Sequence, residues 1–258
     1  MRVFPLHLLL AVAVQLSSPP AHAQHAIGVV LMHGKQSAPG EHDDLAGALV
    51  SAGYAVERPE MCWSNRRIYD LPYLDCLREI HAATARLKSR GATEFVVAGH
   101  SLGANAALAY GAVNRGLKGI VALAPGHRPE VLSRRPQIAA GLATAREHVS
   151  KGRGNATASF PDVNGALLIT VTATANAYLS FLAPDSPAVM PGNAARLTAP
   201  LLYMVGTGDP LQRGPDEIFA KAPSHPLNRY VTVDAGHFDT SAASAPAMVA
   251  WLKELAKN

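Results

Sequence analysis

Short apolar segments alternate with longer amphipathic ones along most of this 258-residue chain. The short segments are rich in Val, Leu and Ile and nearly free of charge, which is typical of strands buried on both faces of a sheet. Strand and helix in alternation indicate a mainly parallel sheet with helices packed on both faces. We therefore predict an α/β fold with a doubly wound sheet of about six strands, formed by residues 28–32, 54–58, 94–98, 119–123, 201–205 and 230–233.

The segments between these strands have the spacing of amphipathic helices. The first predicted helix begins at Asp43-Asp44 and ends at Gly53, because acidic residues favour a helix start and glycine a helix end. Residues 102–113, rich in Ala and Leu, predict a helix directly after the third strand. In three helices, apolar residues at intervals of three or four mark the buried face: Leu45, Ala48, Leu49 and Ala52; Leu74, Leu77, Ile80 and Leu87; and Met248, Trp251, Leu252 and Leu255.

Residues 126–198 interrupt the alternation. Residues 126–161 are polar and contain more arginine than acidic residues, whereas residues 166–182 are apolar and, by their content of Ala and Leu, favour helix over strand. A plain loop of this length is uncommon inside a compact domain. We therefore predict a mostly helical lid insertion at residues 126–198. Its arginines suit either an anionic substrate or envelope surface, or a solvated face.

The first 23 residues have the features of a secretory signal peptide. Arg2 precedes an apolar run over residues 3–16, and Ala21-His22-Ala23 provides a small-residue cleavage site. The run is too short for a comfortable membrane span, so an uncleaved anchor is the less favoured alternative. No later segment is apolar for long enough to cross a bilayer. We expect cleavage near Ala23, export to the periplasm or the medium, and one α/β domain at residues 24–258.

Charge and cysteine content narrow the possible partners and the compartment. The formal net charge is +4, and no basic run is interleaved with aromatic residues, so nucleic acid is not an expected partner. Cys62 and Cys76 are the only two cysteines of the chain. In an exported protein we expect them to form a disulfide; in a reducing compartment they would be buried thiols. The oligomeric state is left open.

The candidate nucleophile is Ser101, in the motif Gly99-His100-Ser101-Leu102-Gly103. The motif follows a predicted strand and precedes a predicted helix, which is the context of a nucleophile elbow. Glycines two positions before and after the serine let the strand and the helix approach closely. The alternative is that Ser101 is an ordinary helix N-cap, which the flanking glycines make the minority interpretation.

Asp209 and His237 follow the fifth and sixth predicted strands. The carboxyl ends of parallel strands share one edge of the sheet, where ligands bind, so three separate strands bring Ser101, Asp209 and His237 to one place. Asp234 and Asp239 flank His237 and are second choices for the acid. The alternatives are that Asp209 only starts a turn with Pro210 and that His237 is a core histidine.

With the chain order Ser, Asp, His, these motifs resemble those of the α/β-hydrolase family. The resemblance covers most of residues 24–258 and implies that Ser101 attacks the substrate, His237 acts as general base and acid, and Asp209 orients the imidazole. The backbone N–H of Leu102 is one candidate oxyanion donor; the family's second donor, after the first strand's His33-Gly34, corresponds to Lys35, with Gln36 as the alternative. The family's usual antiparallel hairpin before that strand is missing here, which indicates a small six-stranded version.

The expected function is that of a serine hydrolase acting on a carboxylic ester through a Ser101 acyl-enzyme. The substrate would be a small-molecule or lipid-like ester, and no cofactor is expected. Alternatives are a thioesterase, amidase or peptidase with the same triad, or a non-catalytic binding protein with this fold.

Other motifs carry weaker signals. Glu41-His42-Asp43-Asp44 resembles a set of metal ligands, but acidic residues suit a helix start and consecutive side chains splay apart, so no metal is expected. Asn155-Ala156-Thr157 fits the N-glycosylation pattern. Three aromatic residues after the second strand either line a substrate pocket or pack the disulfide loop: Trp63, Tyr69 and Tyr73.

Overall fold

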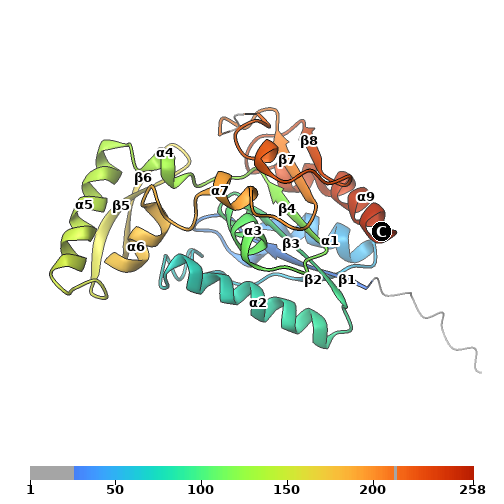
Figure 1. Cartoon of the computed structure of the whole chain (residues 1–258), viewed down its shortest axis with the longest axis horizontal. Helices are drawn as coiled ribbons and strands as arrows, with labels where there is room; N and C mark the ends of the chain where they lie inside the picture. The colour runs from blue at the N-terminus through green and yellow to red at the C-terminus, as the bar shows by residue number, and fades with distance from the viewer. Residues whose placement is uncertain (1–25, 212–213) are drawn as a thin grey trace, which may run out of the picture.

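A six-stranded parallel sheet forms the centre of the computed structural model, which describes residues 26–211 and 214–258 (Figure 1). Each pair of neighbouring strands is parallel, so the predicted sheet is confirmed. The predicted signal peptide lies outside the described residues. The order across the sheet is β2 (Ala55–Glu57), β1 (Ile27–Met32), β3 (Glu94–His100), β4 (Gly119–Leu123), β7 (Leu201–Gly206) and β8 (Arg229–Val233).

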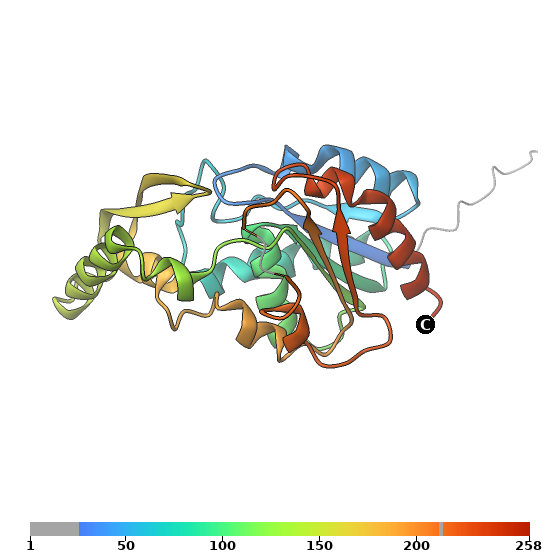
Figure 2. The ribbon, with the colours of Figure 1, turned by 90° about the horizontal axis from the view of Figure 1, so that it is seen from above.

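Helices cover both faces of the sheet, as Figure 2 shows from above. On one face, α1 (Asp43–Ser51) and α9 (Ala245–Leu255) pack with Val29 of β1 in one apolar cluster. On the other, α2 (Tyr73–Ser89) and α3 (Leu102–Val113) pack with Val30 in a second cluster. Successive residues of a strand point to opposite faces, so β1 contributes to both cores. Leu74, expected on the buried face of α2, is instead 56% exposed, because it lies to one side of the stripe that buries Tyr73, Cys76 and Ile80.

The insertion lies beyond one end of the sheet and combines helices with a β-hairpin (Figure 1). Residues 166–182, expected to be helical, are divided at Thr174: the first part is a strand and the second a helix. The strand contains four consecutive β-branched residues, Ile169 to Thr172, which favour extended backbone. The Thr174 hydroxyl caps the helix by accepting a hydrogen bond from Ala177 N at 3.1 Å. The elements are α4 (Pro129–Leu132), α5 (Pro136–Ser150), antiparallel β5 (Thr157–Asn164) and β6 (Leu167–Thr174), α6 (Ala175–Leu182) and α7 (Met190–Ala194).

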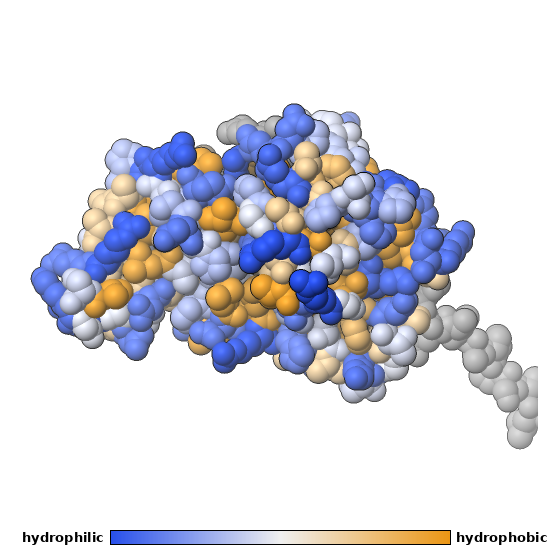
Figure 3. All heavy atoms as spheres, in the orientation of Figure 1, coloured by the Kyte–Doolittle hydropathy of each residue, from blue (hydrophilic) through white to orange (hydrophobic). Residues whose placement is uncertain are grey.

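Three short helical segments complete the described structure: η1 (Pro39–His42), η2 (Phe219–Lys221) and α8 (Thr240–Ala243). Within residues 26–211 and 214–258, none of the helices has the length and apolar character that a bilayer crossing requires. On the face drawn in Figure 3, hydrophobic atoms form small separate areas among hydrophilic ones, on both the insertion and the sheet domain.

A buried ion pair joins the insertion to the sheet domain. Lys35 Nζ, in the loop after β1, lies 2.9 and 3.0 Å from the two carboxylate oxygens of Asp162 on β5 and 2.9 Å from Val163 O. Tyr69 donates its hydroxyl to the same carboxylate at 2.7 Å. Burial alone would raise the pKa of Asp162, but the Lys35 charge and the hydrogen bonds from Lys35 and Tyr69 contribute to a combined effect that outweighs it, and the pKa is lowered. Asp162 is therefore an ionised, fully paired anion in the interior.

Close by, His127 connects the same junction to α6. Its Nε2 lies 2.8 Å from the Phe181 carbonyl oxygen, which can only accept, so Nε2 carries the proton. Burial, together with the Lys35 charge and against the opposing effect of Asp162, lowers the pKa of His127 to about 3. His127 is therefore neutral at pH 7.

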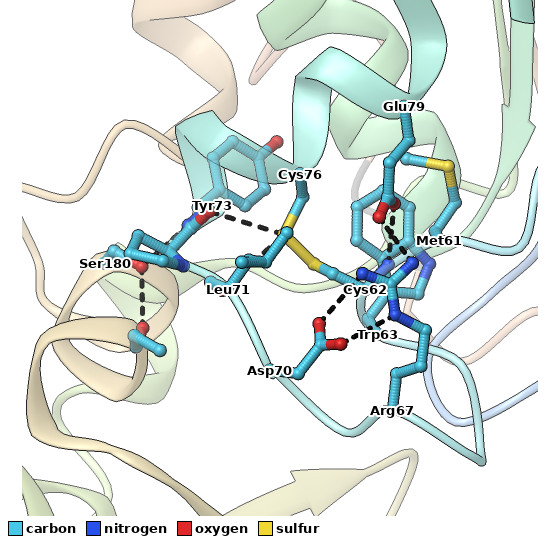
Figure 4. Close-up of a disulfide and its surroundings, with 12 residues drawn as sticks. Met61, Cys62, Trp63, Arg67, Asp70, Leu71, Tyr73, Cys76, Glu79 and Ser180 are labelled. Carbon is cyan, nitrogen blue, oxygen red and sulfur yellow. Dashed lines mark hydrogen bonds and ion pairs between the residues drawn. A yellow bond between two sulfur atoms is a disulfide. The ribbon is translucent and has the colours of Figure 1, made fainter. Parts of the chain in front are cut away.

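A disulfide between Cys62 and Cys76 ties the loop after β2 to the first turns of α2 (Figure 4). Glu79 accepts a hydrogen bond from Cys62 N at 2.8 Å, and Arg67 bridges Glu79 and Asp70. A loop of about 15 residues closed in this way gains roughly 3 kcal/mol in the chain-entropy model. The aromatic residues of this region are buried in the core: Trp63, Tyr69 and Tyr73.

Replacing Asp162 with Asn is expected to lower the free energy of unfolding by about 3–5 kcal/mol, because it leaves the Lys35 ammonium buried without a counter-charge. Urea unfolding followed by circular dichroism measures the change. The control is Glu147→Gln, which removes an exposed ion pair with Lys151 and should cost less than about 1 kcal/mol. A loss for Asp162→Asn as small as that of the control contradicts the prediction.

Stability is expected to fall as the pH drops from about 6.5 towards 3, in part because of His127. Its pKa is lower in the folded protein than in the unfolded chain, so unfolding takes up a proton in this range; the stabilisation is complete above the unfolded pKa and is lost progressively below it. The loss is at most about 1.4 kcal/mol per pH unit. In His127→Gln, urea unfolding at pH 7, 6, 5 and 4 should show a shallower decline; equal slopes would rule out this role.

Candidate functional site

Ser101 lies in a sharp turn between β3 and α3, with φ 54° and ψ −112°. Such left-handed backbone costs about 1–3 kcal/mol in a residue other than glycine and persists only where its surroundings hold it in place. A Cβ atom on Gly99 would lie 2.3 Å from the Gly103 backbone, and one on Gly103 would lie 2.6 Å from Met32 O. Both glycines are therefore needed for the close approach that forms the turn.

The space in front of the Ser101 hydroxyl is kept open by Gly126. A Cβ atom at residue 126 would lie 2.6 Å from Ser101 Oγ. The Gly126 backbone also donates a hydrogen bond to Ser101 O at 3.1 Å. Any side chain at this position would therefore press against the hydroxyl.

Ser101, His237 and Asp209 form one hydrogen-bonded series. His237 Nε2 lies 3.1 Å from Ser101 Oγ, and His237 Nδ1 lies 2.7 Å from Asp209 Oδ2. The Asp209 side chain is fully buried, and its other oxygen accepts a hydrogen bond from Leu211 N at 2.8 Å. A carboxylate only accepts, so Nδ1 carries the proton of the neutral ring and Nε2 presents its lone pair to the hydroxyl.

Backbone hydrogen bonds between the loops after β7 and β8 fix the positions of Asp209 and His237 relative to each other. Gly208 N donates to Ala235 O at 3.0 Å, and Thr207 N donates to Val233 O at 2.8 Å. The second-choice acid Asp234 accepts a 3.4 Å hydrogen bond from the Thr207 hydroxyl instead. The structure thus brings together the three residues predicted from separate strands.

The predicted donors, the backbone N–H groups of Lys35 and Leu102, have no acceptor within the described part of the chain. Leu102 is the first residue of α3, where backbone N–H groups lack a partner within the helix. The alternative donor Gln36 is already engaged, because its N–H donates to Trp63 O at 2.9 Å. Lys35 and Leu102 therefore keep donors available for an oxyanion.

A cavity of about 470 Å³ opens onto Ser101 and His237. Its size is that of a small-molecule site. The sheet domain and the insertion both contribute to its wall, and the three aromatic residues of the disulfide loop do not. Apolar lining residues are Leu132, Val163, Ala166, Pro210, Leu211 and Phe238; polar ones include Lys35, His127, Arg135 and Asn164.

A second group of polar side chains lies beside the series: Glu41, His42 and His100. Burial, assisted by His237 and His42, lowers the pKa of His100 to about 4. Burial would raise the pKa of Glu41, but the Gly34 N–H and the nearby rings of His42 and His100 together outweigh it and lower this pKa to about 2. The sequence pattern did not single out His100, because it occupies the variable position of the elbow motif.

The side chains of residues 41–44 do not all splay apart as expected from their spacing. Glu41 Oε2 and His42 Nε2 lie 3.3 Å apart, because both residues belong to the tight turn η1. Asp43 does turn away and pairs with Arg58. Splaying therefore separates Asp43 from the other two residues and leaves Glu41 and His42 together.

Comparison with known proteins gives the fold a family. Similar solved structures include a siderophore hydrolase from Aspergillus fumigatus (TM-score 0.66, 17% identity, covering 93% of this chain and 94% of that one). Others are a monoacylglycerol lipase from Paleococcus ferrophilus (0.64, 20%, 88% and 94%) and a structure from work on two metagenome-derived lipolytic enzymes (0.63, 18%, 91% and 95%). At these identities, the likeness concerns the fold alone.

No protein of curated function matches the sequence. The family model described as "Alpha/beta hydrolase family" matches residues 29–250, which is most of the chain. The parallel sheet, the serine at the turn after β3 and the residues that follow β7 and β8 all lie within this range. The chain therefore belongs to the alpha/beta hydrolase family.

Proposed function

We propose that this protein is a serine hydrolase that cleaves a carboxylic ester through an acyl-enzyme on Ser101. The observation that carries the proposal is the series from Asp209 through His237 to Ser101 Oγ, with separations of 2.7 and 3.1 Å, opening onto a cavity. A serine hydroxyl is a weak nucleophile unless an adjacent base takes its proton. His237 Nε2 is placed to do so.

In the first half of the reaction, Ser101 Oγ attacks the ester carbonyl while His237 Nε2 takes the hydroxyl proton. Asp209 stabilises the resulting imidazolium through Nδ1–H. The negative charge on the carbonyl oxygen is stabilised by the N–H groups of Lys35 and Leu102, and such a donor is worth roughly 100- to 1000-fold in rate. Collapse of the intermediate breaks the bond to the alcohol oxygen, which leaves with the proton from His237.

In the second half, water attacks the acyl group on Ser101. His237 takes a proton from the water and returns one to Ser101 Oγ as the carboxylic acid departs. The enzyme is then restored to its starting state. No other group is needed for the proton balance.

The cavity favours a small-molecule or lipid-like ester. Its lining is largely apolar and its volume is about 470 Å³, which suits an acyl chain or a compact alcohol group. Structural relatives described as lipolytic enzymes and as a monoacylglycerol lipase act on esters of this kind. A thioesterase domain is also among the relatives, so thioesters are the first alternative to test. The disulfide supports the proposal that the protein works after export.

A fluorophosphonate probe is expected to label the wild type and to spare Ser101→Ala, because only an activated serine reacts with it. Intact mass spectrometry gives the stoichiometry. The mature protein is then assayed with matched ester, thioester and amide substrates of increasing acyl length, and esters should give the highest kcat/KM. A folded wild type that is not labelled would indicate a non-catalytic binding protein; faster thioester or amide turnover would reassign the bond that is cleaved.

Asp209→Asn is expected to lower kcat for the best ester by about 10³- to 10⁴-fold, because an amide can donate to Nδ1 and so favour the wrong tautomer of His237. The matched control is Asp234→Asn, three residues before His237 and bonded to Thr207. Its kcat should stay within about threefold of the wild type, since it does not touch the ring. Equal losses in the two variants would show that Asp209 has no special role.

A further inference from the structure

Glu41, His42 and His100 converge beside the cavity from two parts of the chain. Glu41 and His42 belong to η1, whereas His100 is the last residue of β3. One carboxylate oxygen and one nitrogen from each imidazole lie within 4.8 Å of one another. His42 and His100 are 4% and 1% exposed, so both rings belong to the protein interior.

The tautomer of His100 follows from its contact with the loop that carries His237. His100 Nε2 lies 2.8 Å from His237 O, and because a carbonyl oxygen only accepts, Nε2 must carry the proton. In the neutral ring, Nδ1 is then a bare lone pair. It is buried without a hydrogen-bond partner among the described residues, and the nearest charged atom is Glu41 Oε1 at 3.9 Å.

At His100 the arrangement therefore points one acceptor at another, because the Nδ1 lone pair faces the Glu41 carboxylate. Glu41 is anionic, and its Oε2 already accepts from Gly34 N at 2.7 Å. His42 Nε2 is a second buried nitrogen without a hydrogen bond in the described structure; it lies 3.3 Å from the carboxylate. A buried lone pair facing a carboxylate is costly unless something positive lies between them.

We propose that Glu41, His42 and His100 bind one Zn²⁺ ion at the edge of the cavity. Two imidazole nitrogens and a carboxylate form a donor set that zinc favours, whereas calcium and magnesium prefer oxygen ligands alone. Around tetrahedral zinc, ligand atoms lie about 3.3 Å apart, given bonds of about 2.0–2.1 Å. The three side chains would therefore draw together by less than about 1 Å each.

Two of the three proposed ligands, His100 and Glu41, have the partners expected around a metal site. A histidine that binds a metal commonly donates its other N–H to a backbone carbonyl, and a ligating carboxylate is itself hydrogen-bonded. His100 donates to His237 O, and Glu41 accepts from Gly34 N. Glu41 and His100 also line the cavity, which leaves the fourth zinc position open to water. The ion would stiffen the loop that carries His237 without touching its ring.

Isothermal titration calorimetry with ZnCl₂ tests the site, using the mature chain without a polyhistidine tag and after treatment with a chelator. One ion per chain is expected for the wild type. Glu41→Gln, His42→Gln and His100→Gln should each weaken binding at least tenfold. The control is His81→Gln, whose side chain is exposed on α2, and its affinity should match that of the wild type. Absence of saturable binding, or binding that the three substitutions leave unchanged, overturns the proposal.

X-ray absorption at the zinc edge on the loaded wild type gives a second measurement that needs no variant. The expected spectrum shows four nitrogen or oxygen ligands, two of them with the multiple scattering of imidazole. A spectrum with one imidazole or none would place the ion elsewhere and overturn the assignment. Neither measurement depends on hydrolytic activity, so the proposed ester hydrolysis can fail while the zinc site stands, and the reverse.

Discussion

The approach of two backbones at Gly99 and Gly103 is the constraint on which the site depends. Where β3 ends and α3 begins, the chain leaves no room for a Cβ atom at either position, and Ser101 between them is held in a backbone conformation that a non-glycine residue rarely adopts. The strain serves a purpose, because it projects Oγ away from the sheet while the first amides of α3 remain unpaired. The sheet supplies the rigidity that keeps this turn in place.

Everything else in the site is positioned relative to that turn. β7 and β8 follow β3 and β4 across the sheet, and all four strands are parallel. The loops after β7 and β8 therefore lie on the same edge as Ser101. The insertion closes the cavity from outside and is held by the buried charges of Lys35 and Asp162. A buried pair of this kind adds little net stability but is costly to break. It therefore specifies one position of the insertion rather than strengthening the fold as a whole.

Local patterns predicted most of the sheet, because buried parallel strands are short, apolar and bounded by turns. The positions of Ser101, Asp209 and His237 could be read from the same patterns, since each directly follows a strand. The prediction of helix over residues 166–182 was wrong, because it used the average composition of the segment. That average does not show the boundary between strand and helix at Thr174, whose side chain caps the helix.

Contacts between distant segments could not be predicted either. Lys35 reaches Asp162 across 127 positions, and His100 meets Glu41 only because β3 and η1 end at the same edge. The periodicity of apolar residues along the chain contains no information about such long-range contacts. The exposure of Leu74 has a local cause instead, because the buried stripe of α2 passes through Tyr73 and Cys76 and leaves Leu74 to one side.

The backbone and the side chain of Lys35 belong to different parts of the site, so a movement of one affects the other. In the mechanism proposed above, its backbone N–H is an oxyanion donor, and its ammonium group holds Asp162 of β5. If the hairpin swings outward to admit a bulky molecule, either the ion pair breaks or the peptide at residue 35 is dragged along. Where the ion pair stays intact, the open form would lack this proposed oxyanion donor, and catalysis would resume only after the hairpin closes again. Substrate entry would then require the open form and ester cleavage the closed form, so the two steps would alternate.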